Sequence, residues 1–463
     1  MKHYDTVVVG GGPGGYVAAE EAAKYGHSVG LVEMKHLGGT CLNTGCIPSK
    51  TLLRHSEALE LMEKARQWGI EYTNVSVSFD KMMQRKDTVI KSLRQGVASL
   101  LQKEQVDIYN GKGTIHQDHR ISIESDHGTD IISARNIIVA TGSKPFIPLI
   151  NGVDETTVHT SDTIFELDHI PKSLVIIGGG IIGVEFACIF SSLDVEVTII
   201  EMENRLIAGE DEDASELITK KLKKDSVNIF TSAKVQAASE TVDGKEVHLE
   251  LEDGKRLTLE CEEILLASGR TPNLSACTKL NLQMNGSFIA VNHHMETSMP
   301  NIYAIGDVIG GWQLAHVASA EGIVAAANAS GHDKQVDYKV VPRCIYTLPE
   351  IASVGLTEKE AMKKGYTVRT ETIPLGSNGK AFAMDEKNGF VKLIAEETFD
   401  EILGIVMVGP HVTEMISEAS SFITLEGTVQ ELASLIHPHP TLSEGIWEVA
   451  KRWLAKKKQP ITR

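Results

Sequence analysis

Two cysteines five residues apart, Cys41 and Cys46, are the residues of this chain best suited to redox chemistry. The loop between them is too short for a disulfide to stabilise a fold of this size by much. Pro48 suits the first turn of a helix, so Cys46 is expected near the positive end of that helix, which favours a thiolate. A zinc site would need further ligands at recognisable spacing, and the sequence around the pair offers none. The pattern favours a redox-active pair over a metal site or inert thiols.

A second set of candidate residues lies near the C-terminus, where His437 and His439 are followed by Glu444. A His-x-His pattern can bind a metal, although a metal site would need more ligands than these two. A histidine that acts as a general base beside a thiol is instead held in one tautomer by a carboxylate on its other ring nitrogen. Glu444 is the candidate for that carboxylate.

A glycine-rich pattern occurs twice along the chain. In the first copy an apolar strand leads into the glycine run at residues 10–15, and a helix and a second strand ending on Glu33 follow. The second copy has its glycine run at residues 178–183 and ends on Glu201. In both copies the acid follows the last glycine by 18 residues. Strand, glycine turn, helix, strand and acid in this order are typical of a dinucleotide-binding βαβ unit.

Each feature of the repeated pattern has a physical reason. The first glycine allows a tight turn, the second lets the backbone approach a pyrophosphate, and the third lets the helix pack on the strand. The helix N-terminus attracts phosphates, and the acid accepts hydrogen bonds from ribose hydroxyls. A glycine turn without a ligand is the alternative, but two matching copies in the same context favour two bound dinucleotides. The glycines expected to line them are Gly10, Gly12 and Gly15, and Gly178, Gly180 and Gly183.

The composition excludes several classes of protein. With 45 Lys and Arg against 62 Asp and Glu, the 463-residue chain has a net charge of −17, which disfavours nucleic-acid binding. No stretch approaches the roughly 18 apolar residues of a membrane helix, and the N-terminus does not resemble a signal peptide. We therefore expect a globular cytoplasmic protein. The six cysteines are too sparse for a secreted scaffold, and for most of the four outside the pair we expect buried positions: Cys188, Cys261, Cys277 and Cys344.

The order of the motifs is similar to that of the FAD-dependent pyridine nucleotide-disulfide oxidoreductases. The similarity covers essentially the whole chain. It rests on the following segments: the two glycine runs, with Tyr16 after the first; Gly38 to Lys50; Ala140 to Ser143; Gly269 to Asn273; Ala304 to Asp307; Leu314 to His316; and His437 to Glu444.

The resemblance implies an α/β fold with two Rossmann-like domains, one for FAD and one for NAD, and a C-terminal α+β dimerisation domain. Near Pro342 the chain changes to alternating strand and helix patterns, as a separate terminal domain would. The expected segments are 1–148 for the first part of the FAD domain, 149–271 for the NAD domain, 272–341 for the second, central part of the FAD domain, and 342–463 for the dimerisation domain.

The resemblance also implies which residues hold the cofactors. The expected FAD residues are Gly10, Gly12, Gly15, Glu33, Lys50, Gly113, Thr141, Gly142, Asp307 and Ala315. The expected NAD residues are Gly178, Gly180, Gly183, Glu201, Gly269 and Arg270. Glu201 at the ribose position would repel a 2′-phosphate, so NAD is favoured over NADP. Arg205 is a nearby cation, although an arginine beside an acid more often forms an ion pair.

By the same resemblance Cys41 is the thiol that exchanges with the substrate and Cys46 faces the flavin. Lys50 would stabilise negative charge on the reduced flavin and pair with Glu185, although each could be an ordinary helix residue. The family pattern places the general base at His439, with Glu444 as its partner and His437 in a structural role. The family forms homodimers in which this histidine reaches the other subunit's cysteine pair.

Within the family, the motifs are most similar to those of enzymes that oxidise dihydrolipoamide with NAD⁺. Their partners are the lipoyl domains of 2-oxo acid dehydrogenase-type complexes. Another NAD(P)H-dependent disulfide reductase of the same fold is one alternative. A catalytically idle subunit of such a complex is a second alternative, which the intact set of cysteines, histidine and acid disfavours.

Overall fold

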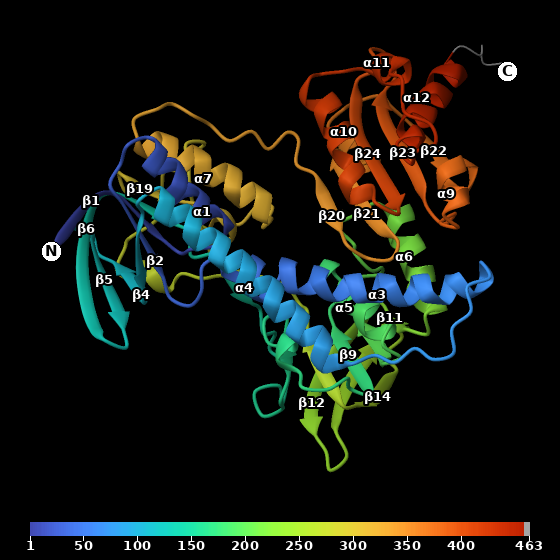
Figure 1. Cartoon of the computed structure of the whole chain (residues 1–463), viewed down its shortest axis with the longest axis horizontal. Coiled ribbons are helices and arrows are strands. Elements are labelled where there is room, and N and C mark those ends of the chain that lie inside the picture. The colour runs from blue at the N-terminus through green and yellow to red at the C-terminus, as the bar shows by residue number, and fades with distance from the viewer. Residues whose placement is uncertain (458–463) are drawn as a thin grey trace. The chain divides into compact units, whose positions relative to one another are not determined.

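The computed structural model describes residues 1–457 of the chain (Figure 1). It divides into two compact units. The first comprises Met1–His55, Glu71–Pro171 and Glu263–Val336, and the second comprises Ser56–Ile70, Lys172–Glu262 and Asp337 onward. These units are coarser than the four segments expected from the sequence, whose boundaries stay predictions. Within the described residues, no helix combines the length and the apolar character needed to cross a membrane.

The first unit is built on a sheet with the strand order β3-β2-β1-β6-β5-β4, and β19 pairs with the end of β6. The strands are β1 (Lys2–Val9), β2 (Val29–Glu33), β3 (Asp107–Asn110), β4 (Lys112–Ile115), β5 (Arg120–Ser125), β6 (Gly128–Val139) and β19 (Ile302–Ala304). The strands β3, β2, β1, β6 and β19 run parallel, whereas β4 and β5 form an antiparallel extension. Parallel strands buried on both faces read as continuous apolar runs, and β1 ends in three buried valines.

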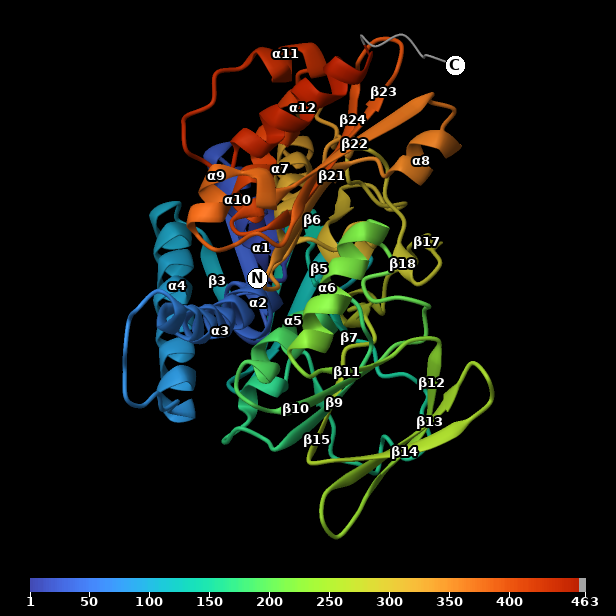
Figure 2. The same cartoon turned by 90° about the vertical axis from the view of Figure 1, so that its right-hand side faces the viewer.

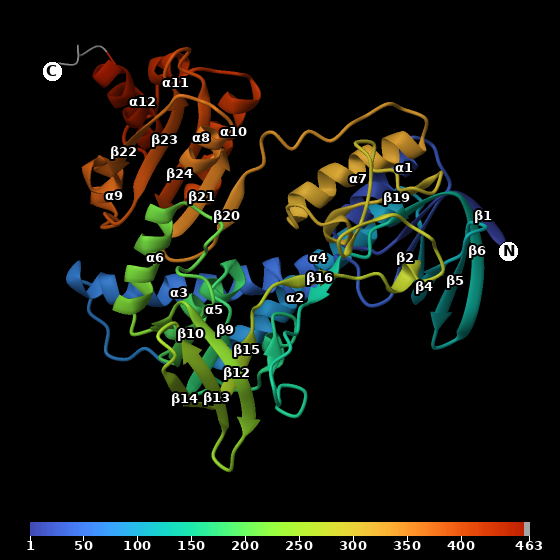
Figure 3. The same ribbon diagram turned by 180° about the vertical axis from the view of Figure 1, so that it is seen from behind.

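Two helices of the first unit pack closely beside this sheet. They are α1 (Pro13–Lys24) and α7 (Ala315–Ala329), which lie side by side in Figures 1 and 3. Their contact depends on glycine, because a Cβ at Gly14 would lie 2.9 Å from the Ala318 carbonyl oxygen and one at Gly322 would lie 2.5 Å from that of Gly14. Beyond α1 the chain forms α2 (Gly39–Thr44), α3 (Cys46–Gln67) and α4 (Phe79–Lys103).

Short elements complete the first unit. They are β7 (Ser143–Pro145), β8 (His159–Thr160), β15 (Glu263–Leu266), β16 (Arg270–Pro272), β17 (Met284–Asn285), β18 (Phe288–Ile289) and the 3₁₀ helices η1 (Ile164–Glu166), η2 (Ser275–Cys277) and η3 (Gly306–Ile309). β8 pairs parallel with β15, and β7 pairs antiparallel with β16. The β7–β16 pair brings two segments of distant sequence together beside η3.

The second unit contains the repeat of the βαβ pattern. Parallel strands β11 (Asn228–Phe230), β10 (Glu196–Ile200) and β9 (Ser173–Ile177) lie in this order, with α5 (Ile181–Ser191) between β9 and β10 in sequence and α6 (Glu212–Lys224) after β10. An antiparallel sheet of β12 (Ala233–Glu240), β13 (Lys245–Leu251) and β14 (Arg256–Cys261) follows, and Figure 2 shows its hairpins extending from the unit.

The rest of the second unit is an antiparallel sheet with helices, in the part of the chain where the sequence indicates alternating strands and helices. The strand order is β20-β21-β24-β23-β22. The bounds are β20 (Arg343–Ile345), β21 (Glu350–Gly355), β22 (Val368–Pro374), β23 (Phe390–Glu396) and β24 (Ile402–Gly409), with α8 (Glu358–Lys363), η4 (Leu375–Ser377), α9 (Gly379–Ala383), α10 (Val412–Thr424), α11 (Val429–Ser434) and α12 (Glu444–Lys457). α10 packs on β21 and β24, and α12 packs on β22 and β23 around the buried Trp453 (Figure 3).

Charged pairs join α6 and the loop before it to this terminal sheet. Arg343 Nε lies 3.1 Å and 3.3 Å from the two carboxylate oxygens of Glu210. Lys392 Nζ lies 2.7 Å from Asp211 and 2.6 Å from Asp213. The side chains of Arg343, Glu210, Lys392 and Asp211 are all nearly buried, so these contacts are desolvated and hold the nucleotide-binding part and the terminal sheet in one unit.

Candidate active site

The two cysteines of the predicted redox pair lie on consecutive helices. Cys41 is in α2, and Cys46 is the first residue of α3, which confirms its predicted position at a helix N-terminus. Gly45 separates the two helices, and Pro48 lies in the first turn of α3. The break at Gly45 therefore turns the chain so that two cysteines five residues apart meet.

The thiols of Cys41 and Cys46 are hydrogen-bonded to each other. This hydrogen bond, together with burial, raises the pKa of Cys41 far above its ordinary value, and the nearby Lys50 ammonium opposes the shift. Negative charge on the pair is therefore held more easily at Cys46, where the N-terminal end of α3 favours a thiolate. Lys50 is thus close enough to the pair to act on its charge, and its expected place beside the flavin stays a prediction.

Sequence reasoning missed two residues that hold α2 in place. The Asn43 side-chain amide donates to the Leu37 carbonyl at 3.1 Å and to the Gly39 carbonyl at 2.8 Å. Arg94, on α4, donates to the Asn43 side-chain oxygen at 2.7 Å and 3.2 Å. Asn43 lies within the conspicuous segment around the cysteines, so its position was a signal. Arg94 is 51 residues away from Asn43, and nothing in the sequence around it indicated this contact.

The first glycine run lies at the carboxyl ends of β1 and β6, next to the N-terminus of α1. A Cβ at Gly15 would lie 1.9 Å from the Gly10 carbonyl oxygen, so only glycine allows helix and turn to approach so closely. Gly12 precedes α1 without a side-chain hydrogen bond from any described residue, and a Cβ there would meet nothing closer than 3.9 Å. Glu33 is buried and accepts from the backbone N–H groups of Gly11 and Lys35, both at 2.7 Å.

The second glycine run repeats this geometry residue by residue. A Cβ at Gly183 would lie 2.0 Å from the Gly178 carbonyl oxygen, and one at Gly180 would meet nothing within 4 Å. Glu201 follows β10 and accepts from the backbone N–H groups of Gly179 and Glu203. The chain thus contains the same arrangement twice, as the repeated spacing predicts. We call this arrangement of glycine turn, helix N-terminus and strand-end carboxylate a dinucleotide cradle.

Arg205, the cation near Glu201, does not form the ion pair with this acid that the sequence suggested. Arg205 donates to the Ala208 carbonyl at 2.6 Å and to the Glu210 carbonyl at 2.9 Å. It therefore shapes the loop after β10, and within residues 1–457 it forms no ion pair with Glu201.

The other residues expected around FAD lie at the same end of the first sheet. Gly113 is buried on β4, where a Cβ would lie 3.1 Å from Val9, and Ala315 is the first residue of α7. Asp307 lies in η3, directly after β19, and accepts from Ser143 Oγ at 2.5 Å. Two further expected residues, Thr141 and Gly142, connect β6 to β7, and both bond the backbone of Asn273. All residues assigned to FAD therefore belong to the first unit, and their contact with FAD stays a prediction.

The residues expected at NAD are divided between the units. Gly178, Gly180, Gly183 and Glu201 belong to the second unit, whereas Gly269 and Arg270 belong to the first. The Arg270 guanidinium bonds Ser143, Ser161 and Asp162. Glu185 is buried in α5, where it accepts from the Tyr346 backbone N–H at 3.0 Å. Its pairing with Lys50 joins residues of different units and stays a prediction.

The C-terminal histidines each bond a carboxylate. His439 Nδ1 lies 2.9 Å from Glu444 Oε1, and the imidazole is 78 % exposed. The bonds from the Thr441 backbone N–H and from His439 lower the pKa of Glu444, so it stays ionised in the neutral range. His437 Nε2 lies 2.8 Å from Glu418, a residue that sequence reasoning missed, and its side chain is buried. These contacts fit the expected roles, with the exposed His439 as general base and the buried His437 as a structural residue.

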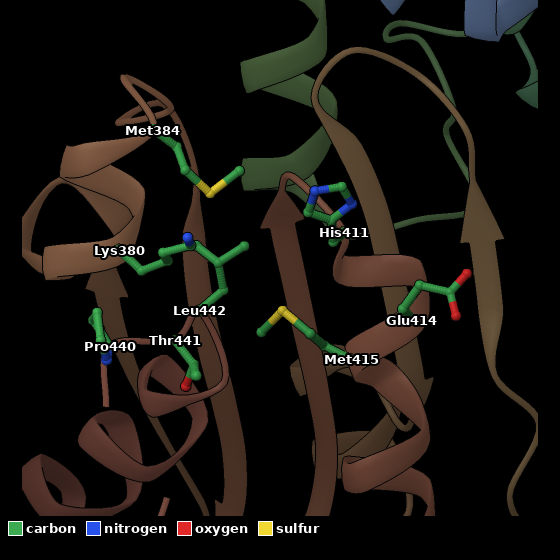
Figure 4. Close-up of a pocket in the computed structure, with 8 residues that line it drawn as sticks. All are labelled: Lys380, Met384, His411, Glu414, Met415, Pro440, Thr441 and Leu442. Atoms are coloured by element: carbon green, nitrogen blue, oxygen red, sulfur yellow. The ribbon is translucent and has the colours of Figure 1, made fainter. Parts of the chain in front are cut away.

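A cavity of about 360 Å³ lies beside the loop that follows His439. Figure 4 shows side chains from α9, from the start of α10 and from this loop around it. Its lining residues are Lys380, Met384, His411, Glu414, Met415, Pro440, Thr441 and Leu442. Most of its exposed lining surface is apolar, although Lys380, His411 and Glu414 also contribute to it.

The remaining cysteines are placed as expected for inert thiols. Cys188, Cys261 and Cys277 are buried, and Cys344 is partly exposed. Burial raises the pKa of Cys188 to about 12 and that of Cys277 to about 12. A thiol that stays protonated in the neutral range is a poor nucleophile.

The two cradles fit dinucleotides. Their helix N-termini present backbone N–H groups toward open space above a glycine, which suits a pyrophosphate. Their carboxylates are held at the strand ends, where ribose hydroxyls bind. A thiol pair in the same unit as one cradle, with a second cradle elsewhere in the chain, suits electron transfer between a disulfide and a pyridine nucleotide. Fold and site thus define a flavin-dependent disulfide oxidoreductase.

Comparison with known sequences agrees with this class. Residues 4–322 match the model of the pyridine nucleotide-disulphide oxidoreductases, and residues 341–450 match the dimerisation domain of the same enzymes. The chain belongs to the pyridine nucleotide-disulphide oxidoreductase family. It is an α/β oxidoreductase that uses FAD and NAD, with two Rossmann-like domains and a dimerisation domain.

Individual relatives match along nearly the whole chain. A dihydrolipoyl dehydrogenase of Bacillus subtilis is 42 % identical over 461 residues, covering 96 % of this chain and 97 % of the relative. One of Chlamydia muridarum is 38 % identical, with coverages of 96 % and 95 %. Among solved structures, LpdA from Mycobacterium tuberculosis has a TM-score of 0.89 at 27 % identity, covering 98 % of this chain and 100 % of that chain. The flavoprotein disulfide reductase RclA from Escherichia coli has a TM-score of 0.88 at 28 % identity, with the same coverages.

Proposed function

We propose that this protein is a homodimeric dihydrolipoamide dehydrogenase, which oxidises dihydrolipoamide to lipoamide and reduces NAD⁺ to NADH. The observation that carries the proposal is the Cys41–Cys46 pair, with Cys46 at the start of α3, in the same unit as the first dinucleotide cradle. Relatives named dihydrolipoyl dehydrogenase along the full length of the chain support this substrate.

The thiols of the chain carry the exchange with substrate. In the oxidised protein a substrate thiolate attacks the Cys41 sulfur of the Cys41–Cys46 disulfide and releases Cys46 as the thiolate. The second substrate thiol then displaces Cys41, so lipoamide leaves as a closed disulfide and the protein holds two electrons on its cysteines. Once the exchange is complete, the raised pKa of Cys41 keeps its sulfur protonated and the negative charge of the reduced pair on Cys46.

His439 provides the base for this exchange. Its Nδ1 faces Glu444, so its Nε2 can accept a proton from the substrate thiol while the ionised Glu444 stabilises the resulting imidazolium. We propose that His439 acts on the cysteine pair of the partner subunit. Its 78 % exposure in the single chain and its position in the dimerisation domain support this.

The glycine run 10–15, Glu33 and Asp307 would hold FAD, which would supply the two-electron chemistry between the dithiol and NAD⁺. Lys50 would place a positive charge near the ring, with Glu185 as its partner. The second cradle orients NAD⁺, and Glu201 selects it over NADP⁺ through the ribose hydroxyls. Arg270 and Gly269 are proposed to complete the NAD site.

The physiological donors are proposed to be lipoyl domains of a 2-oxo acid dehydrogenase-type complex. The proposed location is the cytoplasm, because the substrate dithiol and the reduced Cys41–Cys46 pair persist in a compartment that keeps thiols reduced.

A turnover assay with free dihydrolipoamide and NAD⁺ tests the proposal. NADH should form in step with lipoamide, and Cys41→Ser and Cys46→Ser should each abolish turnover. Cys344→Ser is the matched control and should retain it. Failure to form NADH, with turnover of oxidised glutathione or another disulfide and NADPH instead, would contradict the proposed substrate. An inactive protein that contains FAD and an intact cysteine pair would identify an idle subunit.

A further inference from the structure

A chain of hydrogen bonds runs through the first unit from Asp162 to Asp307. Ser143 Oγ donates to Asp307 Oδ2 at 2.5 Å, and Arg270 Nε donates to the same Ser143 Oγ at 2.7 Å. Arg270 Nη1 donates to Asp162 Oδ1 at 3.0 Å. A serine hydroxyl has a single proton. Because the Arg270 N–H occupies one lone pair of Ser143, the Ser143 proton is directed at Asp307.

Arg270 is held rigidly in this chain. Its Nη2 donates to the Ser143 carbonyl at 3.0 Å, so two of its nitrogens bond the same residue. Its Nη1 also lies 3.2 Å from Ser161 Oγ, and its side chain is only 13 % exposed. Strand pairing between β7 and β16, with Pro272 opposite Ser143, fixes the two backbones. A planar guanidinium with fixed donors suits such a junction better than a flexible ammonium.

The turn that carries Asp307 is held from its other side by Glu321. The Gly306 N–H donates to Glu321 Oε2 at 2.6 Å, and Glu321 is 3 % exposed. Within residues 1–457, Asp307 Oδ1 has no hydrogen-bond partner, whereas Oδ2 is occupied by Ser143. Asp307 is therefore fixed in one orientation with one carboxylate oxygen left for a ligand hydroxyl.

We infer that Ser143 is a positioning residue for FAD, and that Arg270 acts on the cofactor through Ser143 and Asp307. The inference rests on the proposed assignment of Asp307 to the ribitol hydroxyls of FAD. Ser143 restricts the Asp307 side chain before the cofactor binds, so less conformational freedom is lost on binding. This role is additional to any contact of Arg270 with NAD.

The rate at which FAD leaves the purified holoenzyme measures this role, followed as the rise in flavin fluorescence after dilution. A hydrogen bond to a charged group is lost in Ser143→Ala, so its FAD dissociation rate should rise about ten- to a hundredfold. Ser143→Thr keeps the hydroxyl and should stay within roughly threefold of the native rate. Ser122→Ala is the matched control, because Ser122 is also half-buried and its hydroxyl bonds another side chain, His116, just after β4.

A double-mutant comparison separates positioning from general loosening of the fold. Asp307→Asn should itself raise the FAD dissociation rate, and adding Ser143→Ala should raise it by no more than about threefold further, because the two residues act together. Circular dichroism and the elution volume of each variant verify folding. If Ser143→Ala matches Ser122→Ala, or has the same effect with and without Asp307→Asn, the inference is wrong. An unchanged rate in Asp307→Asn would instead overturn the proposed assignment of Asp307 to FAD.

Arg270 provides an independent check. Arg270→Lys cannot bond Ser143 twice and Asp162 at once. It should raise the FAD dissociation rate in the native background and have little effect in Ser143→Ala. A change confined to the KM for NAD⁺, with the FAD rate unaltered, would show that Arg270 acts on NAD alone and would overturn its role in the chain.

Discussion

Cys41 and Cys46 differ in the charge that each thiol can hold. The Cys41 thiol has a raised pKa because it is buried and bonded to Cys46, whereas Cys46 begins α3. Cys41→Ser should therefore show the long-wavelength absorbance of a thiolate beside a flavin without any reductant. Cys46→Ser should lack this absorbance even after mild reduction. Visible spectra of the two purified variants check the assignment, and the opposite pattern would exchange the two roles.

Glu201 is the residue on which the choice between NAD and NADP depends. Its carboxylate is fixed by the N–H groups of Gly179 and Glu203 and would repel a 2′-phosphate. Replacing it in Glu201→Ala and adding an exposed cation in Met202→Arg should shift the NADP/NAD ratio of kcat/KM upward by about tenfold or more. Steady-state kinetics with both nucleotides measure the ratio. Glu203→Ala is the control, and an unchanged ratio in the double variant would show that Glu201 is not at the ribose.

At the scale of elements, Gly183 and Gly180 at the start of α5 are expected to have different roles: Gly183 in helix packing and Gly180 in ligand binding. A Cβ at Gly183 would lie 2.0 Å from the Gly178 carbonyl oxygen, so Gly183→Ala must push α5 away from β9. Gly180 has φ −73° and open space around its Cβ position, so Gly180→Ala fits the free protein. We expect Gly183→Ala to lower the free energy of unfolding by about 1–3 kcal/mol. Gly180→Ala should instead raise the KM for NAD⁺ with little change in stability.

Thermal unfolding and NAD⁺ kinetics on the same two preparations check this contrast. If both variants lost stability equally, the open space above Gly180 would not be the place where the pyrophosphate binds. The corresponding residues of the first copy, Gly15 and Gly12, should give the same contrast with FAD retention as the readout.

At the scale of the whole molecule, the dimer completes the active site. If His439 serves the partner's cysteine pair, a mixed dimer of Cys41→Ser and His439→Ala contains one site with both defects and one site with neither. Random pairing makes about half of the dimers mixed, so about a quarter of all sites should be active after joint refolding of the two variants. Activity per site of the refolded mixture measures this, with mixed dimers confirmed by mass. No recovered activity would place both groups of a site on one chain.

Much of the fold and of the cofactor sites was predictable because the responsible patterns are local. The glycine run, the helix start and the acid at the next strand lie within about 30 residues, and their geometry depends on backbone sterics and helix dipoles. Both copies, Glu33 and Glu201, and Cys46 at the start of α3 are found as predicted. The need of a basic histidine for a carboxylate partner indicated Glu444, and the family pattern assigned it to His439, five residues away.

The sequence by itself therefore determined which reactive and binding groups the protein has: a thiol pair, two dinucleotide cradles and a histidine with its carboxylate. Only the tertiary structure decided which distant side chains hold these groups in place. Ser143 and Asp307 are 164 residues apart, Arg270 and Asp162 are 108 apart, and Arg94 and Asn43 are 51 apart. No periodicity connects such pairs. The first two pairs meet because parallel strands return the chain to the same sheet edge, and the third pair meets because α4 packs beside α2. In each case a hydrogen bond requires the two atoms to lie within about 3 Å of each other.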